Sequence, residues 1–224
     1  MFTGFTQKTI DFMWSIRLNN NKIWFDEHKD EFKENFQTPM KELGLDVFAQ
    51  LNKNFGKRGF VHKLSRIYKD ARRVRDGCPY RDYLWFSIEK PSDDEEESSG
   101  VLTFWFDLNP EGWSYGLGYY AAKAITMEEL RAAIDKNPKK IEKLIDLLKN
   151  QDEFRLEGPE YARQKQAPTV KTQEWYNKKS FSLIHYGQLG AELFEQEFVN
   201  RLVNGFSFLM PFYDYFAEAG KEIK

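Results

Sequence analysis

The sequence predicts a single α+β domain in which a mostly antiparallel sheet packs against N-terminal and C-terminal helices. Apolar residues follow the three-four spacing of amphipathic helices in the first quarter of the chain, alternate with polar residues in the middle, and return to helical spacing from about residue 126. Helices and strands segregated in this way favour α+β over an alternating α/β fold. The 224 residues, 41% apolar and 30% charged, suit one globular domain over residues 1–224.

The N-terminal quarter is expected to hold three helices. Thr6 is placed to cap the first, and the asparagines at 19–21 suit both the end of that helix and the start of the next. The second helix is expected over about residues 22–36. Pro39 predicts a break, after which a third helix carries the apolar residues of 43–51.

The middle of the chain predicts three strands. Residues 84–88 and 102–106 alternate between two faces, and a glycine-punctuated strand is expected over 113–120. Residues 91–100, with five consecutive acids, lie between the first two strands. Because like charges repel and the segment lacks apolar side chains, we expect a mobile hairpin loop there.

The C-terminal part predicts a return to helices. One is expected to begin at Thr126 and another at Pro138, a first-turn proline preceded by an asparagine cap. The polar stretch 151–179 is expected to run over the surface, followed by a short strand near 181–186. A final helical pair is expected, with a break or kink near Pro211.

Composition excludes several classes of protein. The single cysteine, Cys78, rules out an internal disulfide framework and a four-cysteine metal site. No stretch approaches the roughly 20 apolar residues that cross a bilayer, and the opening residues lack a secretory signal, so we expect a cytoplasmic protein without membrane association. A net charge of −2 and a pI near 6.0 make nucleic acid an unlikely partner.

The most site-like segment is basic. Residues 56–81 contain nine lysines and arginines but only two acids. If residues 64–72 form a strand, Arg66, Tyr68, Asp70 and Arg72 project from one face, placing two guanidinium groups beside a ring and a carboxylate. Such groups bind phosphate or carboxylate through paired hydrogen bonds. The alternative is an Arg-Asp network that only holds the strand to its neighbours.

A second candidate lies on the second helix, where His28 accompanies Trp24 and Lys29. Histidine titrates near neutral pH and serves as an acid, a base or a ligand, although a lone histidine in an aromatic stripe is more often a core residue. His62 and His185 are distant in sequence, and no pair has a metal-binding spacing. The sequence therefore predicts no metal site and no cofactor.

Residues 112–116 match the G-x-S-x-G nucleophile pattern by letters only. That motif requires a strand before the serine and a helix after it, whereas here a turn precedes Ser114 and a strand follows. We therefore do not expect a serine hydrolase. Gly116 and Gly118 are interpreted as positions where the backbone bends or another group approaches closely.

Four runs, at 19–32, 66–83, 115–120 and 130–134, resemble a family called domain of unknown function 2461, found in bacteria and fungi, over nearly the whole chain. The most specific matches are Asn19, Asn20, Trp24, Phe25, His28, Lys29, Arg66, Asp70, Arg72, Asp76, Pro79, Tyr80 and Pro211. The family usually has Phe where this chain has Arg73, and Lys where this chain has Cys78. These departures weaken Arg73 and Cys78 as functional candidates. The resemblance implies a single α+β domain without an established activity.

Charge clustering and these motif positions together suggest a ligand-binding site. Its candidate residues are Trp24, His28, Lys29, Arg66, Tyr68, Asp70, Arg72 and Tyr80. The favoured hypothesis is binding of, or chemistry on, a small anionic or phosphorylated ligand. The alternative is a protein-interaction module whose C-terminal helices, rich in Phe and Tyr, pack against a partner, and nucleic-acid binding is a third, less favoured reading.

Overall fold

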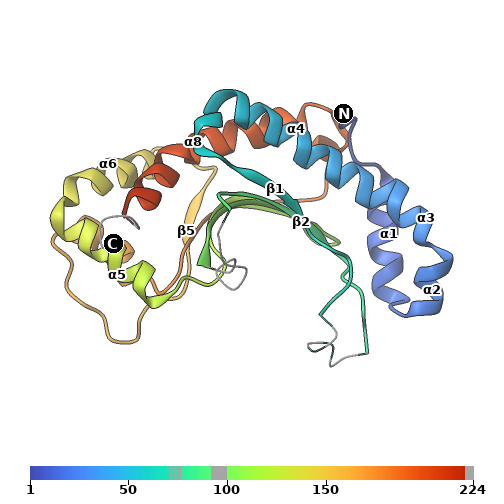
Figure 1. The fold of residues 1–224 in the computed structure, drawn as a ribbon, viewed down its shortest axis with the longest axis horizontal. Helices are drawn as coiled ribbons and strands as arrows, with labels where there is room; N and C mark the ends of the chain where they lie inside the picture. Colours follow the sequence, from blue (N-terminus) through green and yellow to red (C-terminus); the bar gives the residue numbers. More distant parts are fainter. Residues whose placement is uncertain (71, 73, 75–76, 92–99, 220–224) are drawn as a thin grey trace. The chain divides into compact units, whose positions relative to one another are not determined.

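The computed structural model describes residues 1–70, 72, 74, 77–91 and 100–219, and it confirms the α+β class (Figure 1). Six strands form an antiparallel sheet in the order β1-β2-β3-β4-β6-β5. Their bounds are β1 Val61–Leu64, β2 Leu84–Glu89, β3 Leu102–Asn109, β4 Gly112–Tyr119, β5 Arg155–Glu157 and β6 Ser182–Gly187.

The chain forms two compact units. Unit 1 comprises residues 1–88, 105–115 and 186–204, and unit 2 comprises residues 89–104, 116–185 and 205–224. Strands β2, β3, β4 and β6 each contribute residues to both units. All eight residues of the predicted site belong to unit 1.

Unit 1 begins with a run of helices: α1 Gln7–Leu18, α2 Lys22–Glu27, α3 Lys29–Phe32, a π-helix over Lys33–Gln37, and α4 Thr38–Phe55, which a 3₁₀ turn, Gly56–Arg58, follows. The first helix begins after Thr6 as predicted. The second does not extend unbroken over 22–36, because the backbone leaves helical geometry at His28. The break predicted at Pro39 is wrong, since α4 continues directly from the π-helix.

The continuity at Pro39 has a cause outside the helix. Proline has no N–H, so the carbonyl of Asn35, four residues earlier, lacks its usual helical donor. The hydroxyl of Thr9, on α1, donates to that carbonyl at 2.6 Å. Because the orphaned acceptor is satisfied from outside the helix, the chain passes Pro39 without ending.

In unit 1, α4 packs against β1 on one face of the sheet (Figure 1). The His62 ring from β1 lies between Phe48 of α4 and Phe86 of β2, with ring centroids 6.2 and 5.6 Å away. Phe106 of β3 contacts Phe86 on the same face. The core of this unit is therefore largely aromatic.

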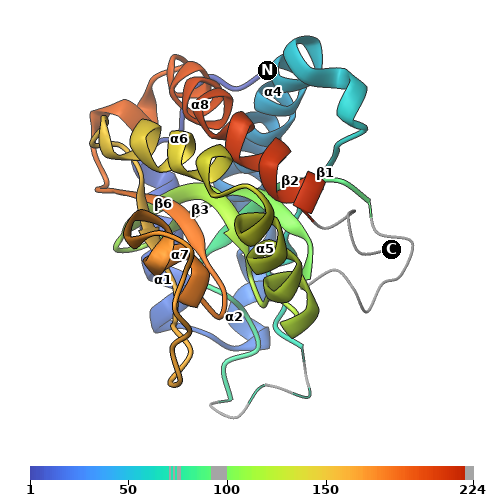
Figure 2. The ribbon, with the colours of Figure 1, turned by 90° about the vertical axis from the view of Figure 1, so that its left-hand side faces the viewer.

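Unit 2 contains α5 Ala124–Lys136, α6 Pro138–Lys149 and the short α7 Gln173–Asn177 (Figure 2). Helix α5 begins two residues before the predicted Thr126, and α6 begins at Pro138 as predicted. The stretch 151–179, expected only to run over the surface, also forms β5 and α7. β5 pairs with β6 in antiparallel register, with Arg155 opposite Ile184.

The last helix, α8 Phe198–Ala219, is a single helix that contains Pro211, so the predicted helical pair is wrong. Its Phe212, Tyr215 and Phe216 are buried. Gly118 shows the predicted close approach, because a Cβ there would lie 2.4 Å from the carbonyl oxygen of Phe181. Residues 92–99 of the predicted acidic loop lie outside the described residues. Across the described chain, no helix combines the length and apolar character that a membrane span requires.

Candidate functional site

The basic segment forms a hairpin rather than a strand over 64–72. β1 ends at Leu64, and Tyr68 then pairs with Tyr80 in an isolated antiparallel bridge. Two backbone hydrogen bonds close it, from Lys69 N to Pro79 O at 2.8 Å and from Arg81 N to Ile67 O at 2.7 Å. We call residues 66–81 the basic hairpin; of these, 71, 73, 75 and 76 are outside the described chain.

Asn20, between α1 and α2, holds Tyr80 of the basic hairpin. The Asn20 amide donates to the carbonyl of Tyr80 at 2.9 Å, while its side-chain oxygen accepts from the Tyr80 N–H at 3.0 Å. The neighbouring Asn21 oxygen accepts from the Trp24 N–H and caps α2, as the sequence predicted. One asparagine therefore pairs with both backbone groups of a residue 60 positions away.

An aromatic cluster connects α2 to the basic hairpin. Phe25 stacks on Tyr80 with centroids 4.2 Å apart, and Tyr68 lies 5.3 Å from Tyr80 and 5.8 Å from Phe25. Tyr80 is buried, and its burial, with a smaller effect of nearby Tyr68 and Asp26, raises the pKa of its hydroxyl. Tyr68 remains 51% exposed. The cluster thus presents one ring to solvent.

Two of the predicted site residues are paired with each other. The Arg72 guanidinium donates to both carboxylate oxygens of Asp70 at 3.2 and 3.0 Å, and this hydrogen bonding raises the pKa of Arg72. The Arg72 N–H also donates to Asp70. Because the Arg72 side chain is 89% exposed, water screens the pair and an incoming anion would compete with Asp70 for the guanidinium.

The second group of predicted site residues, Trp24, His28 and Lys29, lies where α2 ends and α3 begins. The His28 ring stacks on Trp24 with centroids 4.0 Å apart and planes 12° apart. Its Nδ1 lies 2.8 Å from the carbonyl oxygen of Trp24, which only accepts, so Nδ1 donates and Nε2 is the acceptor of the neutral ring. Both residues are half-buried, and Lys29 and Arg66 are exposed.

The sequence interpretation did not include Arg81 among the site residues. Its guanidinium donates from one nitrogen to the carbonyls of Arg66 and Tyr68, both at 2.6 Å. The same group lies over the ring of Trp85 on β2, 5.0 Å from its centroid. No sequence signal identifies this role, because it depends on a turn that brings residue 81 back beside residues 66 and 68.

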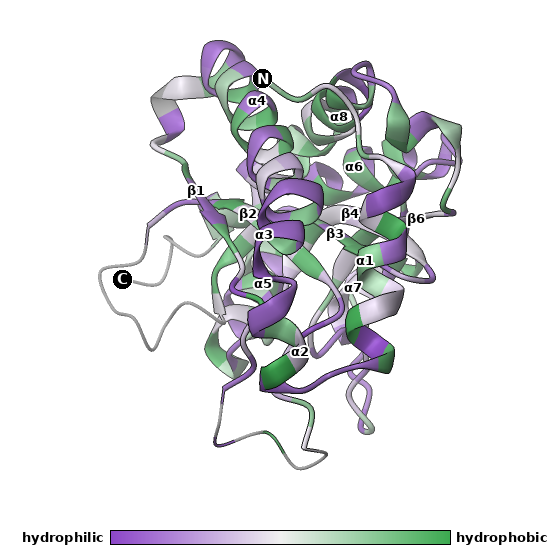
Figure 3. Ribbon diagram, turned by 90° about the vertical axis from the view of Figure 1, so that its right-hand side faces the viewer, coloured by the Kyte–Doolittle hydropathy of each residue, from purple (hydrophilic) through white to green (hydrophobic). Residues whose placement is uncertain are grey.

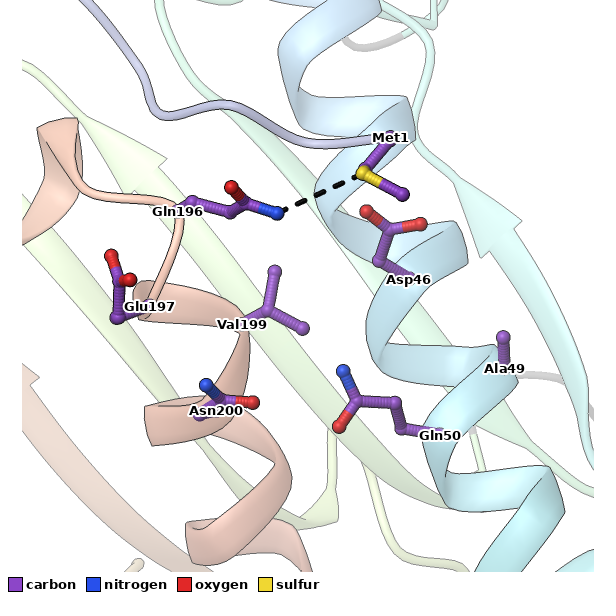
Figure 4. Close-up of a pocket in the computed structure, with 8 residues that line it drawn as sticks. All are labelled: Met1, Asp46, Ala49, Gln50, Gln196, Glu197, Val199 and Asn200. Atoms are coloured by element: carbon purple, nitrogen blue, oxygen red, sulfur yellow. Dashed lines mark hydrogen bonds between the residues drawn. The ribbon is translucent and has the colours of Figure 1, made fainter.

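A groove of about 380 Å³ lies elsewhere in unit 1, between α4 and the start of α8 (Figure 4). Asp46 and Gln50 line it from α4, with Glu197 and Asn200 opposite. The Asp46 carboxylate accepts from the Phe2 N–H at 2.7 Å. Since its two carboxylates would repel an anion, this groove does not suit the predicted ligand. In the described part of the chain, no three His, Cys, Asp or Glu residues gather as a metal site would require.

The fold is that of an α+β protein, and the eight residues of the predicted site all belong to unit 1. The chain belongs to the family of conserved hypothetical proteins DUF2461, whose profile matches residues 8–215. This confirms the family that the sequence resembles. No curated protein matches the chain.

Proposed function

We propose that the protein binds a small anionic ligand, such as a phosphorylated metabolite, at the basic hairpin and the adjoining end of α2. The supporting observation is that the described base of this hairpin is held at Tyr80, by Asn20 and by the stack of Phe25 on the Tyr80 ring. A binding surface that is already ordered loses little conformational entropy when a ligand arrives. The single cysteine, Cys78, is in keeping with a cytoplasmic location for this function.

In this proposal, some residues contact the ligand and others hold the hairpin. Arg66, exposed two residues from Tyr68, supplies the guanidinium fork for a phosphate or carboxylate, and Lys29 adds positive charge. The exposed Tyr68 ring offers a stacking surface to the rest of the ligand. Arg72 contributes once the anion replaces Asp70 as its partner. Asn20 and Arg81 hold the hairpin and do not contact the ligand.

A thermal-shift screen of the full chain tests the proposal, with phosphorylated sugars, nucleotides, carboxylates and short oligonucleotides as probes. A ligand at about 100 times its Kd adds roughly 2.7 kcal/mol to the free energy of unfolding, which moves the Tm of a chain this size by several degrees. We expect Arg66→Ala to weaken binding by roughly tenfold or more, because it removes a charge-assisted hydrogen-bonding group. The Tm of the free Arg66→Ala protein should stay near that of the wild type.

Arg163→Ala is the matched control, since Arg163 is also exposed but lies in unit 2. It should bind like the wild type. Equal binding by Arg66→Ala and Arg163→Ala would contradict the proposed site, and the absence of a shift with every anion would contradict the proposed function. A shift with oligonucleotides alone, falling steeply with salt, would indicate nucleic-acid binding instead.

The alternative, a protein-interaction module, is supported by a different surface from the C-terminal helices that suggested it. The C-terminal aromatics that suggested it are buried. In contrast, Leu18 and Ile23, at the junction of α1 and α2, are 78% and 75% exposed, and Figure 3 shows a strongly hydrophobic turn in α2. Exposed apolar residues so close together are typical of a contact surface. If no small ligand binds, the proteins that co-purify with the wild type should be compared with those that co-purify with Leu18→Ser and Ile23→Ser.

A further inference from the structure

The sheet in unit 1 has two faces of different chemistry. On one face, Phe106 lies 5.5 Å from Phe86 and 6.1 Å from Trp113, and Trp113 packs edge-on against Phe198 at the start of α8. These rings are buried beneath α4 and the first turn of α8. Because side chains alternate along a strand, the neighbours of Phe86 and Phe106 belong to the opposite face.

The opposite face carries Trp85 on β2, and Trp105 and Asp107 on β3. Ser114 of β4 belongs to it too, since its hydroxyl donates to the Asp107 carboxylate. Both tryptophans are half-buried, so they neither fill the core nor lie free in solvent. We call these four residues the aromatic–carboxyl face.

Asp107 is an unfavourable residue for the middle of a strand. Its carboxylate accepts from Ser114 and, at 3.2 Å, from the Asn109 amide, yet burial raises its pKa despite these two hydrogen bonds. An uncharged side chain of similar size would avoid the desolvation of a carboxylate. A half-buried carboxyl with convergent polar partners beside aromatic rings is a composition that ligand sites share.

We propose that the aromatic–carboxyl face binds a neutral polyhydroxylated ring, such as a monosaccharide. An indole offers a flat apolar surface to the C–H side of such a ring, while Asp107 and Ser114 exchange hydrogen bonds with its hydroxyl groups. Charge complementarity supports a neutral ligand. Asp107 would repel an anion, and a cation would have to displace the Arg81 guanidinium from Trp85.

Titration of the full chain with glucose, N-acetylglucosamine and ribose, followed by tryptophan fluorescence and calorimetry, tests this site. Glycerol, a polyol without a ring, is the control ligand. We expect saturable binding of at least one sugar at concentrations up to roughly 10 mM, within reach of a millimolar Kd. Trp105→Ala should weaken that binding by roughly tenfold or more, since it removes the stacking surface.

Trp14→Ala is the matched control, because Trp14 is an exposed tryptophan on α1 of the same unit, and it should bind the sugar normally. Asp107→Asn, which keeps the size of the side chain, should weaken binding even if Trp105→Ala fails to fold. A folded wild type that binds no sugar, or a folded Trp105→Ala or Asp107→Asn that binds like the wild type, would overturn the proposal. Arg66→Ala should leave sugar binding unchanged, so this site and the anion site can fail separately.

Discussion

At the scale of single residues, the contact between His62 and Gly44 limits how closely α4 lies against the sheet. A Cβ on Gly44 would lie 2.2 Å from Nε2 of His62 and 3.1 Å from a ring carbon of Phe86. The Nε2 atom is buried and, among the described residues, has no hydrogen-bond partner. The helix approaches β1 this closely only because residue 44 has no side chain.

Gly44→Ala should therefore lower the free energy of unfolding. Alanine gains about 1 kcal/mol over glycine in a helix interior. Overpacking of a filled interface typically destabilises by roughly 1–3 kcal/mol, so the steric effect should outweigh the helix propensity. Urea denaturation of the wild type and the variant at 25 °C measures the difference.

Gly56→Ala is the matched control at the end of the same helix. Gly56 has φ −56° and ψ −22°, which alanine adopts readily, and no atom lies within 4 Å of the position of its Cβ. This substitution should be neutral or stabilise by about 0.4–1 kcal/mol, because it restricts the unfolded chain. If both substitutions stabilised the protein equally, the His62 contact would not limit the approach of α4.

At the scale of elements, the join between the π-helix and α4 depends on a side chain of α1. Thr9 is fully buried, and its hydroxyl donates to the Asn35 carbonyl that Pro39 leaves without a helical donor. Thr9→Val keeps the shape of the side chain but removes the donor to Asn35, and it also removes the acceptor of the Thr6 N–H, which lies at 3.2 Å. Loss of one partner of a buried hydrogen bond should lower the free energy of unfolding by about 1–3 kcal/mol, again measured in urea.

A double-mutant cycle separates this effect from simple packing. Pro39→Ala restores an N–H near the Asn35 carbonyl, so Thr9→Val should be less harmful in the Pro39→Ala background than in the wild type. Residues that share one hydrogen-bonding group typically show coupling of roughly 0.5–3 kcal/mol. Strictly additive effects would show that Thr9 does not compensate for Pro39.

The elements that the sequence predicts best are those fixed by local signals. Helix α1 follows its Thr6 cap, α6 follows Pro138, and the alternation of β2 and β3 reflects one apolar and one more polar face. The break at Pro39 was wrong because the donor that relieves it comes from another helix. The strand considered for 64–72 ends at Leu64, because Tyr68 pairs with Tyr80 in a hairpin, which alternation fits equally well.

In the candidate site, too, local signals identify residues, whereas the contacts between them depend on the tertiary fold. Sequence motifs single out Asn20, Tyr80, Asp70 and Arg72 as residues of interest, but not which pairs they form. The two hydrogen bonds between the Asn20 side chain and the Tyr80 backbone join residues 60 positions apart, so they depend on the tertiary fold. The pairing of Arg72 with Asp70 is likewise decided by geometry. The alternation places Asp107 on the more polar face of its strand, but nothing in the pattern shows that this carboxyl will be partly desolvated.

At the scale of the whole molecule, stability should depend on pH through two half-buried groups whose charges have opposite signs. Burial lowers the pKa of His62 below its ordinary 6.5, and the nearby positive charge of Lys41 on α4 adds to this. Burial raises the pKa of Asp107 above its ordinary 3.8. Both groups prefer to be neutral in the folded protein, because a desolvated charge is unfavourable.

The two groups act in opposite directions. Below pH 6.5, unfolded chains take up a proton at His62 before folded ones do, so the contribution of His62 to stability is complete above pH 6.5 and declines as the pH falls below it. Asp107 keeps its proton to higher pH in the folded state. Its contribution is complete below pH 3.8 and is lost as the pH rises through its elevated pKa.

Urea midpoints measured from pH 4 to pH 8 for the wild type, His62→Gln and Asp107→Asn test this assignment. Relative to His62→Gln, the wild type should lose stability as the pH falls below about 6.5, because glutamine takes up no proton. Relative to Asp107→Asn, it should lose stability as the pH rises, because asparagine never becomes a buried charge. A constant difference between the wild type and either variant across this range would show that the group in question does not titrate differently in the folded and unfolded chains.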